Sequence, residues 1–81
     1  MSQFFLTIAR IDQTIFEGHV DSVTLPTTEG EITVLPKHVP LISLLRPGSI
    51  TVRQGQRSTT HLQLSGILEI TKNEVAILIA E

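Results

Sequence analysis

The chain has 81 residues, of which 41% are hydrophobic and 17% charged, and its formal net charge is −2 at pH 7. These values predict one globular domain covering residues 1–81 and exclude a disordered chain, and no apolar run reaches the roughly 18 residues of a membrane span. Six scattered basic residues and only three aromatic ones argue against nucleic acid as a partner, and the lack of cysteine excludes disulfides and thiolate metal sites.

Short runs of alternating apolar and polar residues follow one another along the chain. Alternation with a period of two predicts half-buried β-strands. In chain order, the residues predicted to point inward are Phe4, Leu6, Ile8, Ile50, Val52, Leu62, Leu64, Leu68 and Ile70. In this pattern His61 and Gln63 point outward. Residues 75–80 are apolar on both faces, which predicts a strand in the centre of a sheet or beneath a cover.

Turn-forming pairs separate these runs at strand-length intervals. The pairs are Asp12-Gln13, Glu17-Gly18, Glu29-Gly30, Pro47-Gly48, Gln54-Gly55 and Lys72-Asn73. Short strands at this spacing predict an all-β fold, an antiparallel sandwich or barrel. Residues 39–48 come nearest to a helical pattern, but prolines close this segment, so at most one helical turn is predicted there.

The residues that could carry chemistry do not form a catalytic or metal-binding pattern. His19, His38 and His61 are far apart and lack the close spacing of paired zinc ligands. The nucleophile motif Gly-x-Ser-x-Gly and a glycine-rich phosphate loop are both missing from the sequence. Glu29 and Glu31 flank a glycine and are interpreted as turn residues. We therefore predict no metal, no cofactor and no enzymatic activity; a histidine-based metal protein or enzyme is the rival hypothesis.

The segment from Val34 to Leu45 favours recognition of another protein. Its large apolar residues are Val34, Leu35, Val39, Leu41, Ile42, Leu44 and Leu45. Pro36 and Pro40 restrict the backbone, which lowers the entropy lost when the loop is ordered. A small sandwich cannot bury all seven, so we predict that Ile42 and Leu45 join the core. We also predict a residual exposed patch, rimmed by Glu31, Lys37 and His38, with the form of a protein interface.

The same region carries a resemblance to a known family. The stretch "FEGHVDSVTLPTTEGEITVLPKHVPLISLLRPGSITVR" is followed by "SGILEI" and "NEVAIL". These segments resemble, in order and at matching spacing, the family patterns EGxVxSVxLP, xEGExGILPxHxPL, LxPGxIxV, GGxLEV and NxVxIL. They are those of the N-terminal domain of the epsilon subunit of F-type ATP synthases.

The resemblance implies a flattened antiparallel β-sandwich of about ten short strands. It also implies a non-catalytic subunit of the rotating central stalk, which binds the gamma subunit and the c-ring and so couples ion translocation to ATP synthesis or hydrolysis. Such a subunit lies on the cytoplasmic face of the bacterial plasma membrane, as a peripheral membrane protein.

The residues at the family's interface positions follow from the same resemblance. They are Glu29, Gly30, Glu31, Lys37, His38, Val39, Pro40, Leu41 and Ile42. Three positions depart from the family pattern: Thr33 replaces a glycine, Lys37 replaces a small residue, and Ser65 replaces the first glycine of the GG pair. Lys37 adds a positive charge at the expected interface, so the contacts there are expected to differ from those of typical members.

Typical members of the family continue into two C-terminal helices, which are linked to inhibition of ATP hydrolysis and, in some bacterial members, to ATP binding. This sequence stops before that part, so we expect it to bind no nucleotide. We expect the isolated domain to be a monomer. The alternative hypothesis is a stand-alone β-sandwich that self-associates or binds an unrelated protein, without a role in a synthase.

Overall fold

The computed structural model describes residues 2–80, whose regular secondary structure consists entirely of β-strands. The strands are β1 (Phe4–Arg10), β2 (Gln13–Val20), β3 (Ser22–Thr27), β4 (Gly30–Val34), β5 (Leu41–Leu45), β6 (Gly48–Gln54), β7 (Arg57–Gln63), β8 (Gly66–Ile70) and β9 (Glu74–Ile79). The described residues thus form nine strands, one fewer than the resemblance implied. The all-β prediction is confirmed.

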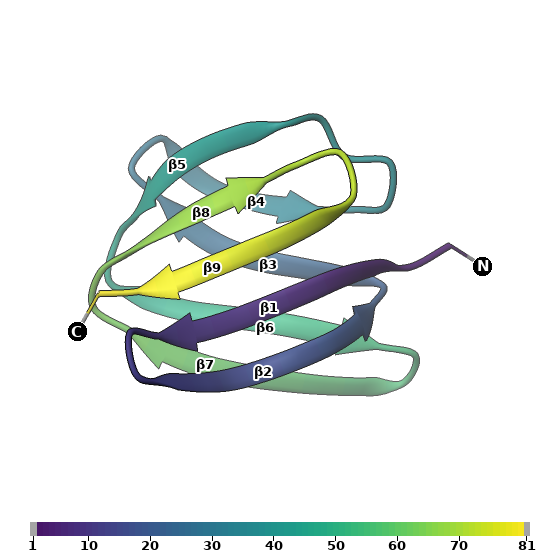
Figure 1. The fold of residues 1–81 in the computed structure, drawn as a ribbon, viewed down its shortest axis with the longest axis horizontal. Coiled ribbons are helices and arrows are strands. Elements are labelled where there is room, and N and C mark those ends of the chain that lie inside the picture. The colour runs from purple at the N-terminus through teal and green to yellow at the C-terminus, as the bar shows by residue number, and fades with distance from the viewer. Residues whose placement is uncertain (1, 81) are drawn as a thin grey trace.

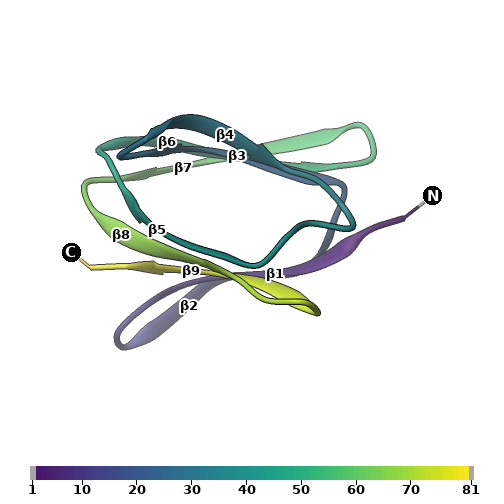
Figure 2. The same cartoon turned by 90° about the horizontal axis from the view of Figure 1, so that it is seen from above.

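The strands form one curled sheet that folds back on itself as the two layers of a sandwich (Figures 1 and 2). The first layer has the strand order β2-β1-β9-β8-β5, and the second layer has the order β4-β3-β6-β7. Neighbouring strands are antiparallel except β1 and β9, which are parallel. The layers meet at a corner where β3 and β5 share the single pair Thr27 and Leu45.

The core lies between the two layers and is built from the inward positions of the alternating strands. Its buried apolar residues are Phe4, Leu6, Ile8, Val20, Val23, Leu25, Val34, Leu45, Ile50, Val52, Leu68, Ile70, Val75, Ile77 and Ile79. The predictions for β1, β6 and β8 are therefore confirmed. Strand β9 lies between β1 and β8, in the centre of the first layer as predicted. Removal of this apolar surface from water is the main force that holds the layers together.

The predicted orientation of β7 is wrong. Leu62 and Leu64 are 75% and 65% exposed, whereas the Gln63 side chain is buried and donates a hydrogen bond from Nε2 to the Arg46 carbonyl. The pairing with β6 explains this result, because the inward residue Ile50 lies opposite His61 and the outward Ser49 lies opposite Leu62. His61 is half-buried against Phe16, with 6.2 Å between the ring centroids.

Three other local predictions are wrong. Glu17-Gly18 is not a turn but lies inside β2, and the strand instead ends at Val20. A bulge between Ile8 and Ala9 of β1 accommodates the extra length of β2. Residues 39–48 contain the strand β5 rather than a helical turn, because its backbone pairs with β8 over all five residues. Leu45 joins the core as predicted, but Ile42 is 70% exposed.

Gly66 allows the close approach of β8 to β9, and its replacement tests the packing of the first layer. A Cβ atom at this position would lie 2.5 Å from the Leu78 carbonyl oxygen and 3.3 Å from the Ile79 Cα. We expect Gly66→Ala to lower the free energy of unfolding by about 1–3 kcal/mol, since these backbone atoms cannot move aside cheaply.

Urea unfolding of Gly66→Ala measures this loss, and Gly18→Ala is the matched control. The nearest atoms to a Cβ at Gly18 are 3.8 Å away, so its free energy of unfolding should stay within about 0.5 kcal/mol of the wild type. Equal stability of the two variants would contradict the packing described here.

Candidate functional site

The predicted interface residues divide between the two ends of the sandwich. The β3–β4 turn, with Glu29, lies at one end, and the β4–β5 loop, residues 35–40, lies at the opposite end (Figure 1). Strand β4 separates them; its five residues at about 3.3 Å each span roughly 15 Å. The structure therefore does not gather Glu29 and His38 into one site. It produces two candidate contact regions.

The β3–β4 turn is rigid and presents acidic side chains. The buried Thr27 hydroxyl donates to the Gly30 carbonyl at 2.7 Å and accepts from the Glu29 backbone N–H at 3.2 Å. Gly30 has φ 119°, a conformation that L side chains rarely adopt. Glu29 and Glu31 are exposed on either side of it. The turn thus has an ordered backbone that presents two exposed glutamates at this end.

The β4–β5 loop is anchored to the core by an aromatic contact. The ring of His38 packs edge-on against Phe4, with 5.4 Å between the centroids and 85° between the planes. Because Phe4 is buried, this contact holds the middle of the loop against the N-terminal strand. The His38 Nδ1 atom is itself buried and has no hydrogen-bond partner among the described residues.

The apolar side chains around this anchor face solvent. Val39, Leu41 and Ile42 are 77%, 41% and 70% exposed, and Pro40 is exposed as well. Lys37, also exposed, has φ 67°, in the left-handed region that favours glycine. An exposed apolar patch is thus present beside Lys37 and His38, and Ile42 belongs to it rather than to the core. Val34 is buried, and Glu31 lies at the other end of β4, so it does not rim the patch.

An open hollow of about 400 Å³ lies beside the β4–β5 loop, in the seam between β4 of the second layer and β5 of the first. Its lining residues are Ile32, Thr33, Val34, Leu35, Pro36, Lys37, His38, Val39, Leu41 and Ile70. The lining is mostly apolar, and its polar residues are Thr33, Lys37 and His38. A hollow of this kind suits an apolar side chain of a protein partner better than a small polar substrate.

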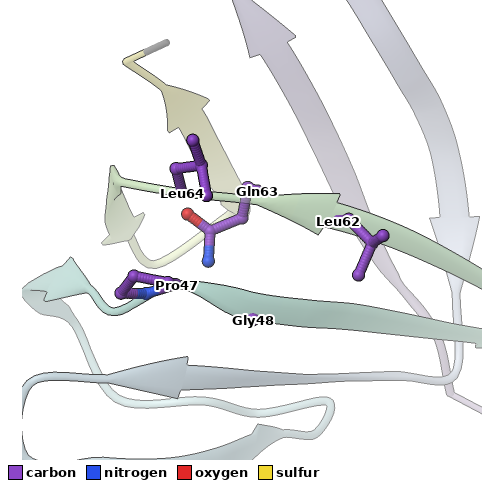
Figure 3. Close-up of a pocket in the computed structure, with 5 residues that line it drawn as sticks. All are labelled: Pro47, Gly48, Leu62, Gln63 and Leu64. Atoms are coloured by element: carbon purple, nitrogen blue, oxygen red, sulfur yellow. The ribbon is translucent and has the colours of Figure 1, made fainter.

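A second hollow, of about 240 Å³, lies at the end that carries the β3–β4 turn. Pro47, Gly48, Leu62, Gln63 and Leu64 line it, on β6, on β7 and in the segments beside them (Figure 3). The buried Gln63 Oε1 has no hydrogen-bond partner among the described residues. This hollow depends on the orientation of β7 that the sequence analysis did not find.

The outer face of the first layer is a surface that the sequence analysis missed. Strand pairing places Leu44, Ile67, Leu78 and Ala9 in one row across β5, β8, β9 and β1. Leu44, Ile67 and Leu78 are 58%, 43% and 48% exposed. The sequence does contain a signal for this surface, because β9 has apolar residues at its outward positions as well as at its inward ones. The row extends the exposed patch of β5 across the whole layer.

The outer face of the second layer is chemically different. Strand pairing aligns four threonines there, Thr33, Thr24, Thr51 and Thr60. The hydroxyls of Thr24 and Thr33 are hydrogen-bonded at 2.9 Å. The outer face of the second layer therefore carries a row of hydroxyl groups, where the outer face of the first layer carries an apolar row.

Residues 2–80 contain no group of three or more His, Asp or Glu side chains placed to hold a metal ion. His19, His38 and His61 each contact a different phenylalanine instead. Over the same residues, no helix is long and apolar enough to cross a membrane.

Comparison with known proteins identifies the family. The model of the family described as "ATP synthase, Delta/Epsilon chain, beta-sandwich domain" matches residues 3–81. The chain belongs to this family. The resemblance inferred from the motifs is thereby confirmed, and so is the sandwich architecture.

Relatives named ATP synthase epsilon chain are similar over most of this chain. The one from Synechococcus sp. (strain RCC307) is 38% identical over 68 residues, which cover 84% of this chain and 50% of the relative. Epsilon chain 2 of Nitrobacter hamburgensis is 35% identical over 78 residues, which cover 96% and 57%. The chain therefore spans about half the length of these relatives.

A solved structure of an ATP synthase contains a similar chain. It is the cryo-EM structure of the Euglena gracilis mitochondrial ATP synthase, OSCP/F1/c-ring in rotational state 1. The TM-score is 0.91 at 28% identity, and the match covers 100% of this chain and 52% of that one. The match in fold thus extends over the whole of this chain.

The left-handed conformation of Lys37 predicts that glycine is more stable at this position. A lysine held at positive φ is strained, whereas glycine is not, so Lys37→Gly should raise the free energy of unfolding by about 0.5–1 kcal/mol and the melting temperature by several degrees. Thermal unfolding followed by circular dichroism measures this change.

Lys72→Gly is the control, because Lys72 lies in an exposed turn and its φ is not positive. Glycine there only adds entropy to the unfolded chain and should lower stability slightly. A Lys37→Gly variant that is no more stable than the wild type would contradict the backbone conformation described.

Proposed function

We propose that this chain is a non-catalytic subunit of the central stalk of an F-type ATP synthase. It binds the gamma subunit and the c-ring and so couples ion translocation to ATP synthesis or hydrolysis. The family membership and the likeness to a chain of a synthase that contains a c-ring support this proposal. Residues 1–81 act in it as one domain.

The separation of the two contact regions is the observation that carries the proposal. A stalk subunit must contact the shaft and the ring at the same time, and here the ends of β4 present two different surfaces. We assign Glu29, Gly30 and Glu31 to the polar loops of the c-ring, because exposed carboxylates on an ordered turn suit polar or basic groups. We assign the loop from Lys37 to Pro40, with Leu41 and Ile42, to gamma, because exposed apolar residues of this kind form the core of protein interfaces.

The same reasoning assigns no chemistry to the chain itself. The described histidines contact aromatic rings rather than one another, and the two hollows described above are lined mainly by apolar residues. We propose that it uses no cofactor, binds no nucleotide and contacts no nucleic acid. Through its partners it lies at the cytoplasmic face of a bacterial plasma membrane, as a peripheral membrane protein.

One observation favours the second candidate function, a sandwich that binds a protein outside any synthase. The apolar row Leu44, Ile67 and Leu78 begins beside Ile42 on β5 and continues across the outer face of the first layer, beyond the two assigned contact regions. A self-associating or unrelated partner could cover that row. Light scattering tests self-association: the proposed stalk subunit should be a monomer at low micromolar concentration, and a tight dimer would favour the second candidate.

The stalk proposal is tested by placing a charge in the contact region on β5. Ile42→Asp should abolish co-purification with the other synthase subunits, because an interface core tolerates an unpaired carboxylate poorly. The measurement is affinity purification of the tagged chain from its native host, followed by mass spectrometry of the bound subunits.

Leu62→Asp is the matched control, since Leu62 and Ile42 are 75% and 70% exposed, on different layers. Both variants should keep the wild-type melting temperature. If the wild-type chain recovers no synthase subunits, the stalk role is wrong. If both aspartate variants recover them equally well, the assignment of Ile42 to the interface is wrong.

A further inference from the structure

Lys37 is the one non-glycine residue of the described chain with a positive φ. The fold does not need a side chain here, because the residue is exposed at a loop and glycine would adopt φ 67° without strain. The Lys37 ammonium makes no ion pair with any described residue. This cation at the rim of an apolar hollow is therefore free to pair with a carboxylate of another protein.

The hollow beside Lys37 indicates which kind of side chain the other protein would insert. Ile32 and Val34 line it on one side, Leu35 and Val39 line it on the loop, and Leu41 and Ile70 line it on the first layer. An apolar side chain would fill it. His38 is part of the same lining, and its contact with Phe4 holds it there.

The edge of β4 defines the backbone conformation of the partner. Strand β4 pairs with β3 and with no other described strand. Strand β5 meets β3 only at Thr27 and Leu45, at the end of the sandwich opposite the loop. The seam between β4 and β5 is therefore closed at the end that carries Thr27 and Leu45, and it is open at the end that carries the β4–β5 loop. An open strand edge beside an apolar hollow is the usual receptor for an extended segment, whose backbone pairs with the edge.

We propose that this seam receives an extended acidic segment of the partner protein. In that segment, a branched apolar side chain enters the hollow and an adjacent Asp or Glu pairs with Lys37. This inference rests on the proposed function, in which the partner is the stalk subunit that faces the β4–β5 loop. Lys37 acts in it as a specificity determinant, because the family pattern has a small residue at that position.

Rebinding of the chain to synthase depleted of it tests the inference. Binding of the labelled wild-type chain and of its variants is measured by fluorescence anisotropy at several salt concentrations. Lys37→Glu should weaken binding about tenfold or more, because a carboxylate would then face a carboxylate, and Lys37→Gln should weaken it less and flatten its salt dependence. Arg57→Glu, an equal charge reversal on β7 of the second layer, should change binding less than about twofold.

Lys37→Gly separates binding from folding. It should weaken rebinding as Lys37→Gln does, although it raises the melting temperature. In a second experiment, each acidic residue of the partner is changed to Lys in turn, and one such change should restore binding to Lys37→Glu.

The possible failures are distinguishable. If the wild-type chain does not rebind to the depleted synthase, the proposed function is wrong and the inference is wrong with it. If the wild-type chain rebinds and Lys37→Glu binds equally well, only the inference is overturned. Equal losses for Lys37→Glu and Arg57→Glu would also overturn it, because they would show a general charge effect rather than a specific pair.

Discussion

The corner at which β3 and β5 meet is the constraint on which the rest of the structure depends. Thr27 pairs with Leu45 across it, and the backbone N–H groups of Thr28 and Arg46 donate to the Leu44 and Pro26 carbonyls at 3.0 and 3.1 Å. These bonds join the two layers at one end. Because β5 then continues with the first layer and β4 stays with the second, the seam between them opens toward the other end. The rigid acidic turn, the apolar hollow and the exposed face of β5 all follow from this divergence.

The difference between the outer faces follows from strand pairing as well. Both layers supply apolar residues to the core, so only their outward positions are free to differ. In the second layer those positions carry the aligned threonines, and in the first they carry Leu44, Ile67 and Leu78. Burial of the exposed leucines and isoleucine would stabilise a complex, whereas the hydroxyl face remains compatible with water. The sandwich is thus suited to be covered on one side.

The sequence was sufficient for the fold class and for most of the inward positions, because alternation in β1, β6 and β8 is strong and each run has one clearly polar face. It was insufficient for β7, where His61, Leu62 and Gln63 give two faces of similar polarity. Only the position of Ile50 opposite His61 decides which face is inward, and that pairing is long-range information. Ile42 was assigned to the core for a related reason: its burial depends on which side of β5 meets β8, and composition does not encode it. The seam could not be predicted at all, since it arises from β4 and β5 leaving the corner in different layers.

The two contact regions are joined by a single strand, β4, which is held in the sheet by its pairing with β3. Strand β4 joins the Thr27–Gly30 turn directly to the β4–β5 loop, and one of these is fixed by hydrogen bonds and the other by the contact of His38 with Phe4. Neither region relies on a long flexible side chain for its position. A displacement imposed on the acidic turn would therefore reach the opposite loop through a paired strand rather than through a hinge. Force transmission between two partners needs this property, and a recognition module with a single partner does not need it. The placement of rigid contacts at both ends of one strand is accordingly the structural argument for a coupling role over simple binding.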